Sequence, residues 1–468
     1  MLTYALEDGG KETLMEQLYR SIRRDIMNGV LKAGEKLPSK RNIAANLGVS
    51  TITVENAYAQ LAAEGYIYTL PRKGCFVSEI GLGRQPEHTS RPAGPESKAA
   101  PAPAPEYFAD FAGNQTRSEF FPFSIWTRLS REILSDSRID LMTNPPSEGI
   151  LALREAIAGH LRDYHGLQVD PEQIIVGAGT EYLYGLLIQL LGPDHRYAFE
   201  DPGYRKVAKI FRSWGINCCP VEMDASGIRV SQLREKQADI IHTSPSHQFP
   251  TGITMPIARR MALLAWADEQ PGRYIIEDDY DSELRLSGQP IPVLQTIDRH
   301  EKVIYINTFT RTLASTVRIS YMVLPPHLAG LYRERLSFYS CTVSTFEQYT
   351  LAAFIQRGYF GKHINRLRKN YRELRDRLLA ALNESPLKGR MTISGEDAGL
   401  HFLMKVDTRL SDDEICMRAQ KKGIRMNALS HYADAATKSS SHTFLICYAS
   451  LPDDRLREAV DRLAEILI

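Results

Sequence analysis

A proline-rich segment between Gly81 and Glu106 sets the strongest limit on what this chain can fold into. The segment is polar and holds almost no apolar side chain that a core could bury. Such a composition is typical of a semi-extended spacer. A secretory stalk or a proline-rich ligand for a partner domain would have the same composition, but the regularly patterned sequence on both sides favours a tether. We therefore expect separate folded units, one in residues 1–80 and another from residue 107 onward, joined by a linker at 81–106.

The overall charge says little about partners. The 468 residues carry a formal net charge of +1, which gives no general field to attract nucleic acid or an anionic membrane. Any DNA binding must therefore depend on a local basic patch. The length favours several domains, and 43% hydrophobic with 24% charged residues is ordinary for globular proteins.

Cysteine usage and the N-terminal sequence favour a cytoplasmic protein. The six cysteines are scattered, without a C-x-x-C pair or the spacing of a zinc site, so we expect a reducing compartment and no metal. The first residues lack the basic and apolar regions of a signal peptide. No apolar run approaches the length that spans a membrane.

Residues 1–80 have the pattern of three helices followed by a hairpin. Apolar residues recur at helical spacing, and turn residues or capping serines separate the runs. The expected elements are a helix from Leu14 to Ile26, a second helix from its cap Ser39 to Gly48, a third from Thr51 to Glu64, and a hairpin from Tyr66 to Val77. The third helix follows the cap Ser50 and is short enough to lie in a major groove. The hairpin has a basic tip that suits phosphates or the minor groove.

Two strings in this region resemble the GntR-type winged helix. They are PSKRxIAxxLGVS from Pro38 to Ser50 and TVxxAYxxLxxEGY from Thr53 to Tyr66. The resemblance implies DNA contacts from Ser39, Arg41, Ser50, Thr51, Thr53, Arg72 and Lys73. Taken alone, the basic residues here would be a solvated helix face. The family often has arginine at the position of Thr51, so this departure predicts a changed base preference or a lower affinity.

Beyond the linker, two strand ends carry candidate ligand groups. Ile174–Gly177 reads as a strand that leads through Gly179 into a helix beginning near Thr180. Backbone amides and the helix dipole at such a turn form a phosphate cup, although a plain tight turn would have the same sequence. A second apolar strand runs into the acids and tyrosine at Asp278–Tyr280, where an open α/β sheet has its ligand crevice.

These segments, in this order, resemble the effector domain of the MocR/GabR family of transcription regulators, which has an aspartate aminotransferase-like fold. The resemblance implies a winged helix-turn-helix (α+β), an α/β pyridoxal-phosphate-dependent transferase-like fold type I domain at 107–350, and a small α+β subdomain at 351–468. It implies that pyridoxal phosphate is held by Gly179, Thr180, Tyr204, Asp278, Tyr280, Thr308 and Arg318. The resemblance implies that Tyr204 stacks on the cofactor ring and that Asp278 pairs with the ring nitrogen. It implies that Thr308 and Arg318 hold the phosphate. Tyr204 alone would more simply be a core residue.

Three positions depart from an amino-acid-handling member of the family. Arg311 stands where the family has the lysine that forms the Schiff base, and Ser450 stands where an arginine holds the substrate carboxylate. Lys206 replaces an anion-binding arginine just after the Pro-Gly-Tyr turn. A guanidinium stays protonated and is a poor nucleophile, so Arg311 cannot replace that lysine. We therefore expect no catalytic residue, a non-covalent pyridoxal phosphate, and an effector pocket changed at Lys206, Arg311 and Ser450.

The sequence thus predicts a DNA-binding transcription regulator whose aminotransferase-like domain senses a small molecule without turnover. The effector would be an amino acid, an amine or a B6 vitamer, and the resemblance implies a head-to-tail homodimer on double-stranded operator DNA. Four alternatives stay open: an active aminotransferase with an added winged helix, a regulator in which Arg311 replaces a natural lysine, a covalent link through Lys206, and a protein-interaction role without DNA.

Overall fold

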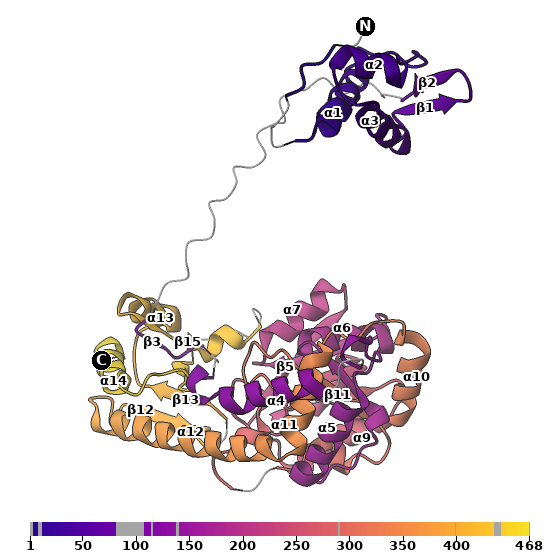
Figure 1. Cartoon of the computed structure of the whole chain (residues 1–468). Helices are drawn as coiled ribbons and strands as arrows, with labels where there is room; N and C mark the ends of the chain where they lie inside the picture. Colours follow the sequence, from indigo (N-terminus) through magenta and orange to yellow (C-terminus); the bar gives the residue numbers. More distant parts are fainter. Residues whose placement is uncertain are drawn as a thin grey trace. The chain divides into compact units, whose positions relative to one another are not determined.

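The computed structural model divides into two compact units, Met1–Ala104 and Pro105–Ile468. The described residues are 3–7, 12–80, 107–113, 116–136, 140–288, 291–397, 399–434 and 441–467. The expected linker at 81–106 lies outside them. Figure 1 labels helices and strands in both units.

The first unit contains three helices and a two-stranded antiparallel sheet. Its elements are α1 (Leu14–Met27), α2 (Lys40–Leu47), α3 (Thr51–Ala63), β1 (Ile67–Leu70) and β2 (Gly74–Val77). Buried apolar residues from all three helices share one core, among them Leu18, Ile43 and Leu61. The predicted helices and hairpin are confirmed.

Local side-chain contacts begin and end these helices. The hydroxyl of Ser39 accepts a hydrogen bond from the backbone N–H of Asn42 at 3.2 Å, and α2 ends at Gly48, whose φ is 67°. The hydroxyl of Ser50 accepts from the backbone N–H of Thr53 at 3.1 Å and caps α3. Both predicted caps are confirmed, because each satisfies a backbone donor that the first turn leaves unpaired.

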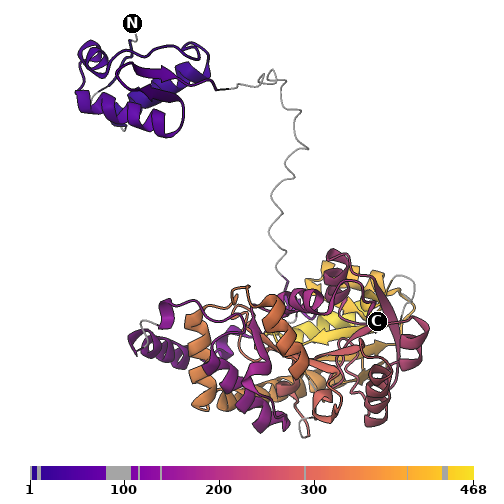
Figure 2. The same cartoon turned by 90° about the vertical axis from the view of Figure 1, so that its right-hand side faces the viewer.

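The second unit is built around an eight-stranded, mostly parallel sheet (Figure 2). In sheet order the strands are β4 (Ile174–Gly177), β11 (Ser320–Val323), β10 (Val303–Thr308), β9 (Tyr274–Asp278), β8 (Ile240–Thr243), β5 (Tyr197–Asp201), β6 (Cys218–Asp224) and β7 (Gly227–Ile228). The five strands from β10 to β6 run parallel, and β11 is antiparallel to both β10 and β4. The carboxyl ends of β4, β5, β8, β9 and β10 therefore meet at one edge.

Helices cover both faces of this sheet. One face packs on α6 (Thr180–Leu191), α7 (Arg205–Ser213) and α10 (Pro326–Leu336). The other packs on α4 (Phe123–Asp136), α5 (Leu151–His165), α8 (Val230–Glu235), α9 (Ile257–Asp268) and α11 (Thr345–Gln356). Strands such as β10 are buried throughout because both faces are covered.

A smaller sheet follows the long helix α12 (Tyr359–Glu384). Its strands are β12 (Met391–Ser394), β13 (His401–Val406), β16 (Thr443–Cys447) and β15 (Asn427–Ala428), flanked by α13 (Asp412–Lys421) and α14 (Leu456–Leu467). Apart from this sheet, β14 (Ile424–Arg425) pairs in parallel with β3 (Ala109–Asp110). The first strand after the linker thus lies with the C-terminal subdomain. The expected division at residue 350 stays a prediction. The architecture confirms the expected fold class.

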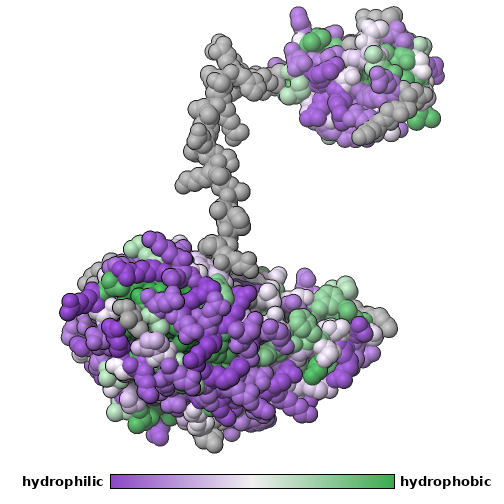
Figure 3. All heavy atoms as spheres, turned by 90° about the vertical axis from the view of Figure 1, so that its left-hand side faces the viewer, coloured by the Kyte–Doolittle hydropathy of each residue, from purple (hydrophilic) through white to green (hydrophobic). Residues whose placement is uncertain are grey.

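The surface is mostly hydrophilic on the face that Figure 3 shows, with smaller apolar areas. Large apolar side chains exposed on the second unit include Phe123, Met142 and Phe338. Among the described residues, none of the helices is long and apolar enough to cross a membrane. The same residues contain no group of His, Cys, Asp or Glu placed to hold a metal ion.

Candidate functional site

A cavity of about 210 Å³ opens where the parallel strands end. It is lined by Gly179, Thr180, Glu181, Tyr204, Lys206, Ser244, Phe249, Asp278, Tyr280, Thr308, Thr310, Arg311 and Arg318. These residues follow or end β4, β5, β8, β9 and β10, so the sheet topology alone brings five distant segments together. Ligands bind at this edge in open α/β folds.

One end of the cavity is suited to an anion. Gly179 precedes the amino terminus of α6, and its φ of 93° belongs to the region that favours glycine. A Cβ there would lie 2.5 Å from a guanidinium nitrogen of Arg318. Lys206 from α7 and Arg318 both turn toward the carboxylate of Glu181: Lys206 donates a short hydrogen bond to it, and a guanidinium nitrogen of Arg318 lies 3.6 Å from it. Two cations thus converge on one carboxylate.

The pKa of Glu181 reflects this arrangement. The hydrogen bond from Lys206 is the largest influence and lowers the pKa of the carboxyl, and the charge of Arg318 acts in the same direction. Glu181 is therefore ionised at neutral pH and acts as the counter-ion of both cations.

Hydroxyl groups form the wall beside this end. The Thr308 hydroxyl accepts from the Ser320 hydroxyl at 2.8 Å and lies 2.8 Å from the Thr310 hydroxyl. The Thr310 backbone N–H also donates to it at 3.2 Å. This chain of hydroxyls fixes the loop that continues into Arg311.

Asp278 also lines the cavity. One carboxylate oxygen, Oδ2, accepts from the Tyr184 hydroxyl at 3.0 Å and lies 3.4 Å from Nε2 of His242. The other oxygen, Oδ1, is buried and has no hydrogen-bond partner within the described structure. A buried acceptor without a partner costs free energy unless a ligand donates to it. Asp278 is thus prepared to receive an N–H from inside the cavity.

Aromatic side chains also line the cavity. Tyr204 is 43% exposed and meets Phe249 edge to face at 5.9 Å. The partly buried Tyr280 places its hydroxyl 3.1 Å from Nδ1 of His247. Burial raises the pKa of Tyr280 well above its ordinary value, so its hydroxyl stays protonated. Flat aromatic walls of this kind suit a planar ring.

Arg311 lines the same cavity from the loop after β10. Its positive charge acts on both Tyr204 and Tyr280 and opposes the effect of burial on their pKa values. Arg311 therefore lies within electrostatic reach of both aromatic side chains.

Nine of the ten predicted cofactor and effector residues line this cavity. Ser450 does not: its hydroxyl donates to the backbone carbonyl of Asp110 at 3.4 Å, near β3. The cavity also contains Glu181, Ser244 and Thr310, to which the sequence pattern assigned no role, and Phe249, which stands where the resemblance places an asparagine of ordinary aminotransferases. Glu181 directly follows the predicted cup, and an acidic residue at a helix amino terminus was the available signal. Its partners Lys206 and Arg318 come from distant segments.

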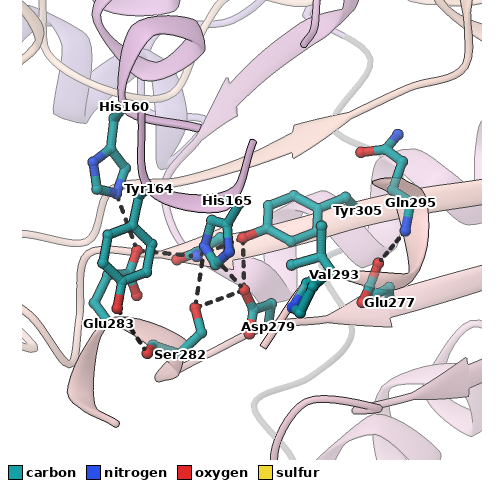
Figure 4. A network of polar contacts seen from close by, with 12 residues as sticks. His160, Tyr164, His165, Glu277, Asp279, Ser282, Glu283, Val293, Gln295 and Tyr305 are labelled. Carbon is teal, nitrogen blue, oxygen red and sulfur yellow. Dashed lines mark hydrogen bonds and ion pairs between the residues drawn. The ribbon is translucent and has the colours of Figure 1, made fainter. Parts of the chain in front are cut away.

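A separate polar network lies next to the cavity residues in sequence (Figure 4). Asp279 accepts from the hydroxyls of Tyr305 at 2.8 Å and Ser282 at 2.7 Å, and lies 3.6 Å from Nε2 of His165. Burial raises the pKa of Asp279 well above its ordinary value and lowers that of His165 to about 4. None of these four residues lines the cavity. The network joins α5 to β9 and β10 and serves the structure of the sheet.

The predicted DNA-contacting residues all belong to the first unit and are solvent-accessible. Those on the helices are Ser39, Arg41, Ser50, Thr51 and Thr53, and Arg72 and Lys73 form the turn between β1 and β2. Arg72 has a φ of 62°, which places it in the left-handed region at the tip of the hairpin. One continuous stretch of chain therefore supplies a helix terminus and a basic wing.

Comparisons with known proteins agree with both units. Residues 14–77 match the model of the gntR family of bacterial regulatory proteins, and residues 119–463 match aminotransferase class I and II. The uncharacterized HTH-type transcriptional regulator YdeL of Bacillus subtilis is 38% identical over 96% of both chains. The probable rhizopine catabolism regulatory protein MocR of Rhizobium meliloti is 31% identical over 96% of this chain and 92% of that protein. The multiple substrate aminotransferase of Thermococcus profundus has 25% identity and a TM-score of 0.68, covering 77% of this chain and 91% of that one.

Fold, site and relatives define an HTH-type transcription regulator in which a GntR DNA-binding domain precedes an aminotransferase class I and II domain. The chain belongs to this family, and within it to the regulators of the MocR type. The expectation of a DNA-binding regulator is confirmed.

The aminotransferase fold belongs to a family that binds pyridoxal phosphate, and the cavity fits that group. The unpartnered Oδ1 of Asp278 is placed to accept from a protonated pyridine nitrogen. Arg318 and Lys206, at the amino terminus of α6, are cations suited to a phosphate. Ring and phosphate would thus each meet a matching group.

Proposed function

We propose that the aminotransferase-like domain binds a B6-type ligand without a covalent bond and uses it to regulate DNA binding by the first unit. The observation that carries this proposal is the buried, unpartnered Oδ1 of Asp278, a residue that lines the same cavity as Arg318. Pyridoxal phosphate, when bound, supplies an electron-withdrawing ring and an aldehyde. Asp278 would hold the ring nitrogen, Tyr204 would stack on the ring, Tyr280 would donate to its hydroxyl, and Gly179, Thr180, Thr308 and Arg318 would hold the phosphate. Lys206, Arg311 and Ser450 stay candidates for contact with the effector.

The same domain is proposed to have no aminotransferase activity, because Arg311 occupies the position of the family's lysine. A guanidinium can bind an anion but can neither attack a carbonyl nor move a proton between carbons at neutral pH. A covalent role for Lys206 is disfavoured, since its amine already donates a hydrogen bond to Glu181. Amino-group transfer by the purified chain would contradict this part of the proposal.

Calorimetry on the dialysed full-length chain tests the ligand. We expect saturable binding of pyridoxal phosphate, complete release on dialysis, and no mass increase after borohydride treatment. An Arg311→Lys variant is the matched comparison and should gain mass at residue 311 after the same treatment. No measurable heat with the parent chain would overturn the ligand, and a mass increase on the Lys206 peptide would overturn the non-covalent mode.

A gel-shift experiment on the chain's own promoter region tests the coupling. We expect the full-length chain to retard this DNA and pyridoxal phosphate to change the apparent affinity. If the affinity for DNA were unchanged at saturating pyridoxal phosphate, the proposed regulation of DNA binding by this ligand would be wrong.

A head-to-tail homodimer is also proposed. The family resemblance supports this proposal, and Phe338 and Met142, which are 76% and 77% exposed, are large apolar side chains that such an interface would cover. Light scattering should give twice the mass of 52.8 kDa. A Phe338→Ser variant should dissociate more readily, whereas a monomer at all concentrations would exclude the dimer.

A further inference from the structure

The outward face of α3 in the DNA-binding unit has an unusual composition for a surface that meets DNA. From Thr51 to Ala63 it contains neither lysine nor arginine. Its exposed side chains before the last turn are Thr51, Ile52, Glu55, Asn56, Ala59 and Gln60. The exposed cations Arg41, Arg72 and Lys73 lie on α2 and at the hairpin tip instead. The cations that would bind phosphates thus lie outside α3, the helix expected to face the bases.

Ile52 and Asn56 stand together on this face. They are four residues apart in a helix, so their side chains are neighbours. Ile52 lies in the first turn of α3 and is 69% exposed, although the rest of the unit buries its apolar helix residues well. In the free protein Ile52 therefore stabilises the fold less than a buried isoleucine would. Its side chain is available to be covered by a bound partner.

The remaining polar groups of this turn are already engaged. The Ser50 hydroxyl accepts from the Thr53 backbone N–H and lies 2.8 Å from the Thr53 hydroxyl. Glu55 accepts from the Lys40 ammonium at 2.5 Å. This ion pair offsets the negative charge of Glu55, which would otherwise repel DNA phosphates. A hydroxyl such as that of Thr51 can serve any base pair, so it discriminates little. Ile52 and Asn56 are left as the side chains that distinguish bases.

The major groove gives each of these two side chains a specific partner. Thymine is the base that presents a methyl group there, and adenine presents an acceptor and a donor that match an amide. We propose that α3 recognises A·T base pairs, with Ile52 packed on a thymine methyl and Asn56 bonded to the edge of an adenine in each half-site. Arginine–guanine contacts play no part in recognition by this helix, and the cations of α2 and the hairpin bind phosphates.

Base replacement in a selected duplex tests the methyl contact directly. The full-length chain would first select its sites from a randomised duplex pool, and each thymine of the selected site would then be replaced by uracil, which lacks only the methyl. We expect one thymine per half-site at which uracil weakens binding about fourfold, the equivalent of one buried methyl group. The Ile52→Ala variant should bind the thymine and uracil duplexes equally well at that position.

Val30→Ala provides a matched control, because Val30 is a similarly exposed aliphatic residue (65%) that lies outside α3. It should keep the full sensitivity to uracil. The Asn56→Ala variant should lose its preference at one adenine, with other positions and the salt dependence of binding unchanged.

Two results would overturn the proposal: selected half-sites without an invariant A·T pair, or a uracil effect that persists in Ile52→Ala. A chain that selects no sequence at all would instead bring the DNA-binding function itself into question.

Discussion

The two units of this protein build their functional surfaces in different ways. In the DNA-binding unit, one continuous stretch from Ser39 to Lys73 provides the caps, the exposed helix face and the basic turn. In the second unit, residues from Gly179 to Arg318 reach a single cavity only because five strands end at the same edge. Local contacts are sufficient for the first surface, whereas the second requires the whole sheet. The two surfaces should therefore respond independently to mutation.

Leu61→Ala should have the largest effect and should be confined to the first unit. Leu61 is fully buried, and removing such a side chain costs about 3 kcal/mol of unfolding free energy. Scanning calorimetry of the full-length chain should show one transition lowered and the other unchanged. The exposed Val30→Ala is the control and should shift neither by more than about 0.5 kcal/mol. A parallel shift of both transitions would show that the units are not independent.

Glu277 makes the stability of the second unit dependent on pH. Burial raises its pKa to about 7, although the backbone N–H groups of Leu294 and Gln295 donate to its carboxylate. Because the folded pKa exceeds the unfolded one, this stabilising contribution is present below about pH 4.5 and is lost as the pH rises through 7. Between pH 5 and 8 the loss amounts to about 2 to 3 kcal/mol.

The Glu277→Gln variant isolates this contribution. The free energy of unfolding of the variant minus that of the parent chain should be larger at pH 8 than at pH 5 by about 2 to 3 kcal/mol. A constant cost of the altered hydrogen bonds cancels in this comparison. Urea unfolding at the two pH values measures the difference. His165, whose pKa burial lowers to about 4, has the opposite slope between pH 4 and 6.5, and it is present in both proteins. A difference that does not vary with pH would contradict the assignment.

Asp278→Asn tests the second surface without changing its shape. The amide keeps the volume but loses the charge that would pair with a protonated ring nitrogen. Such charge-assisted bonds contribute about 2 kcal/mol, so pyridoxal phosphate should bind roughly thirtyfold more weakly in calorimetry. DNA binding without ligand should be unchanged. Asp163→Asn, at an exposed carboxylate outside the cavity, should leave the ligand affinity intact.

Ser50→Ala should have the smallest effect and would sharpen the view that the first surface depends on local contacts. Losing the hydrogen bond from the Thr53 backbone N–H should lower the unfolding free energy of the first unit by about 1 kcal/mol. Ser50→Asn should recover most of it, because asparagine is an equally good cap. Failure of asparagine to recover stability would show that Ser50 acts through contacts other than the cap.

The sequence predicted the first unit in detail because its signals are local. Helix boundaries at Ser39, Gly48 and Ser50 follow from backbone groups within a few residues. The strand ends at Gly177 and Asp278 were also readable, since turn residues follow buried runs. These features needed no knowledge of the tertiary structure.

The remaining features depend on long-range packing. Residues 109–110 pair with 424–425, and no local pattern specifies so distant a partner. Ser450 bonds to the same N-terminal segment instead of lining the cavity. The pairing of Glu181 with Lys206 depends on how α6 and α7 pack, which periodicity does not encode.

That last pairing also determines how the cavity handles anions. Lys206 and Arg318 already have a counter-ion from within the chain, so on the proposed binding mode a ligand phosphate would compete with the carboxylate of Glu181 for these cations. Binding becomes an exchange of one anion for another, and its apparent strength is the difference between two similar interactions. If the proposed ligand binds here, the acid at position 181 would therefore influence the concentration at which the regulator responds, together with the cations around it.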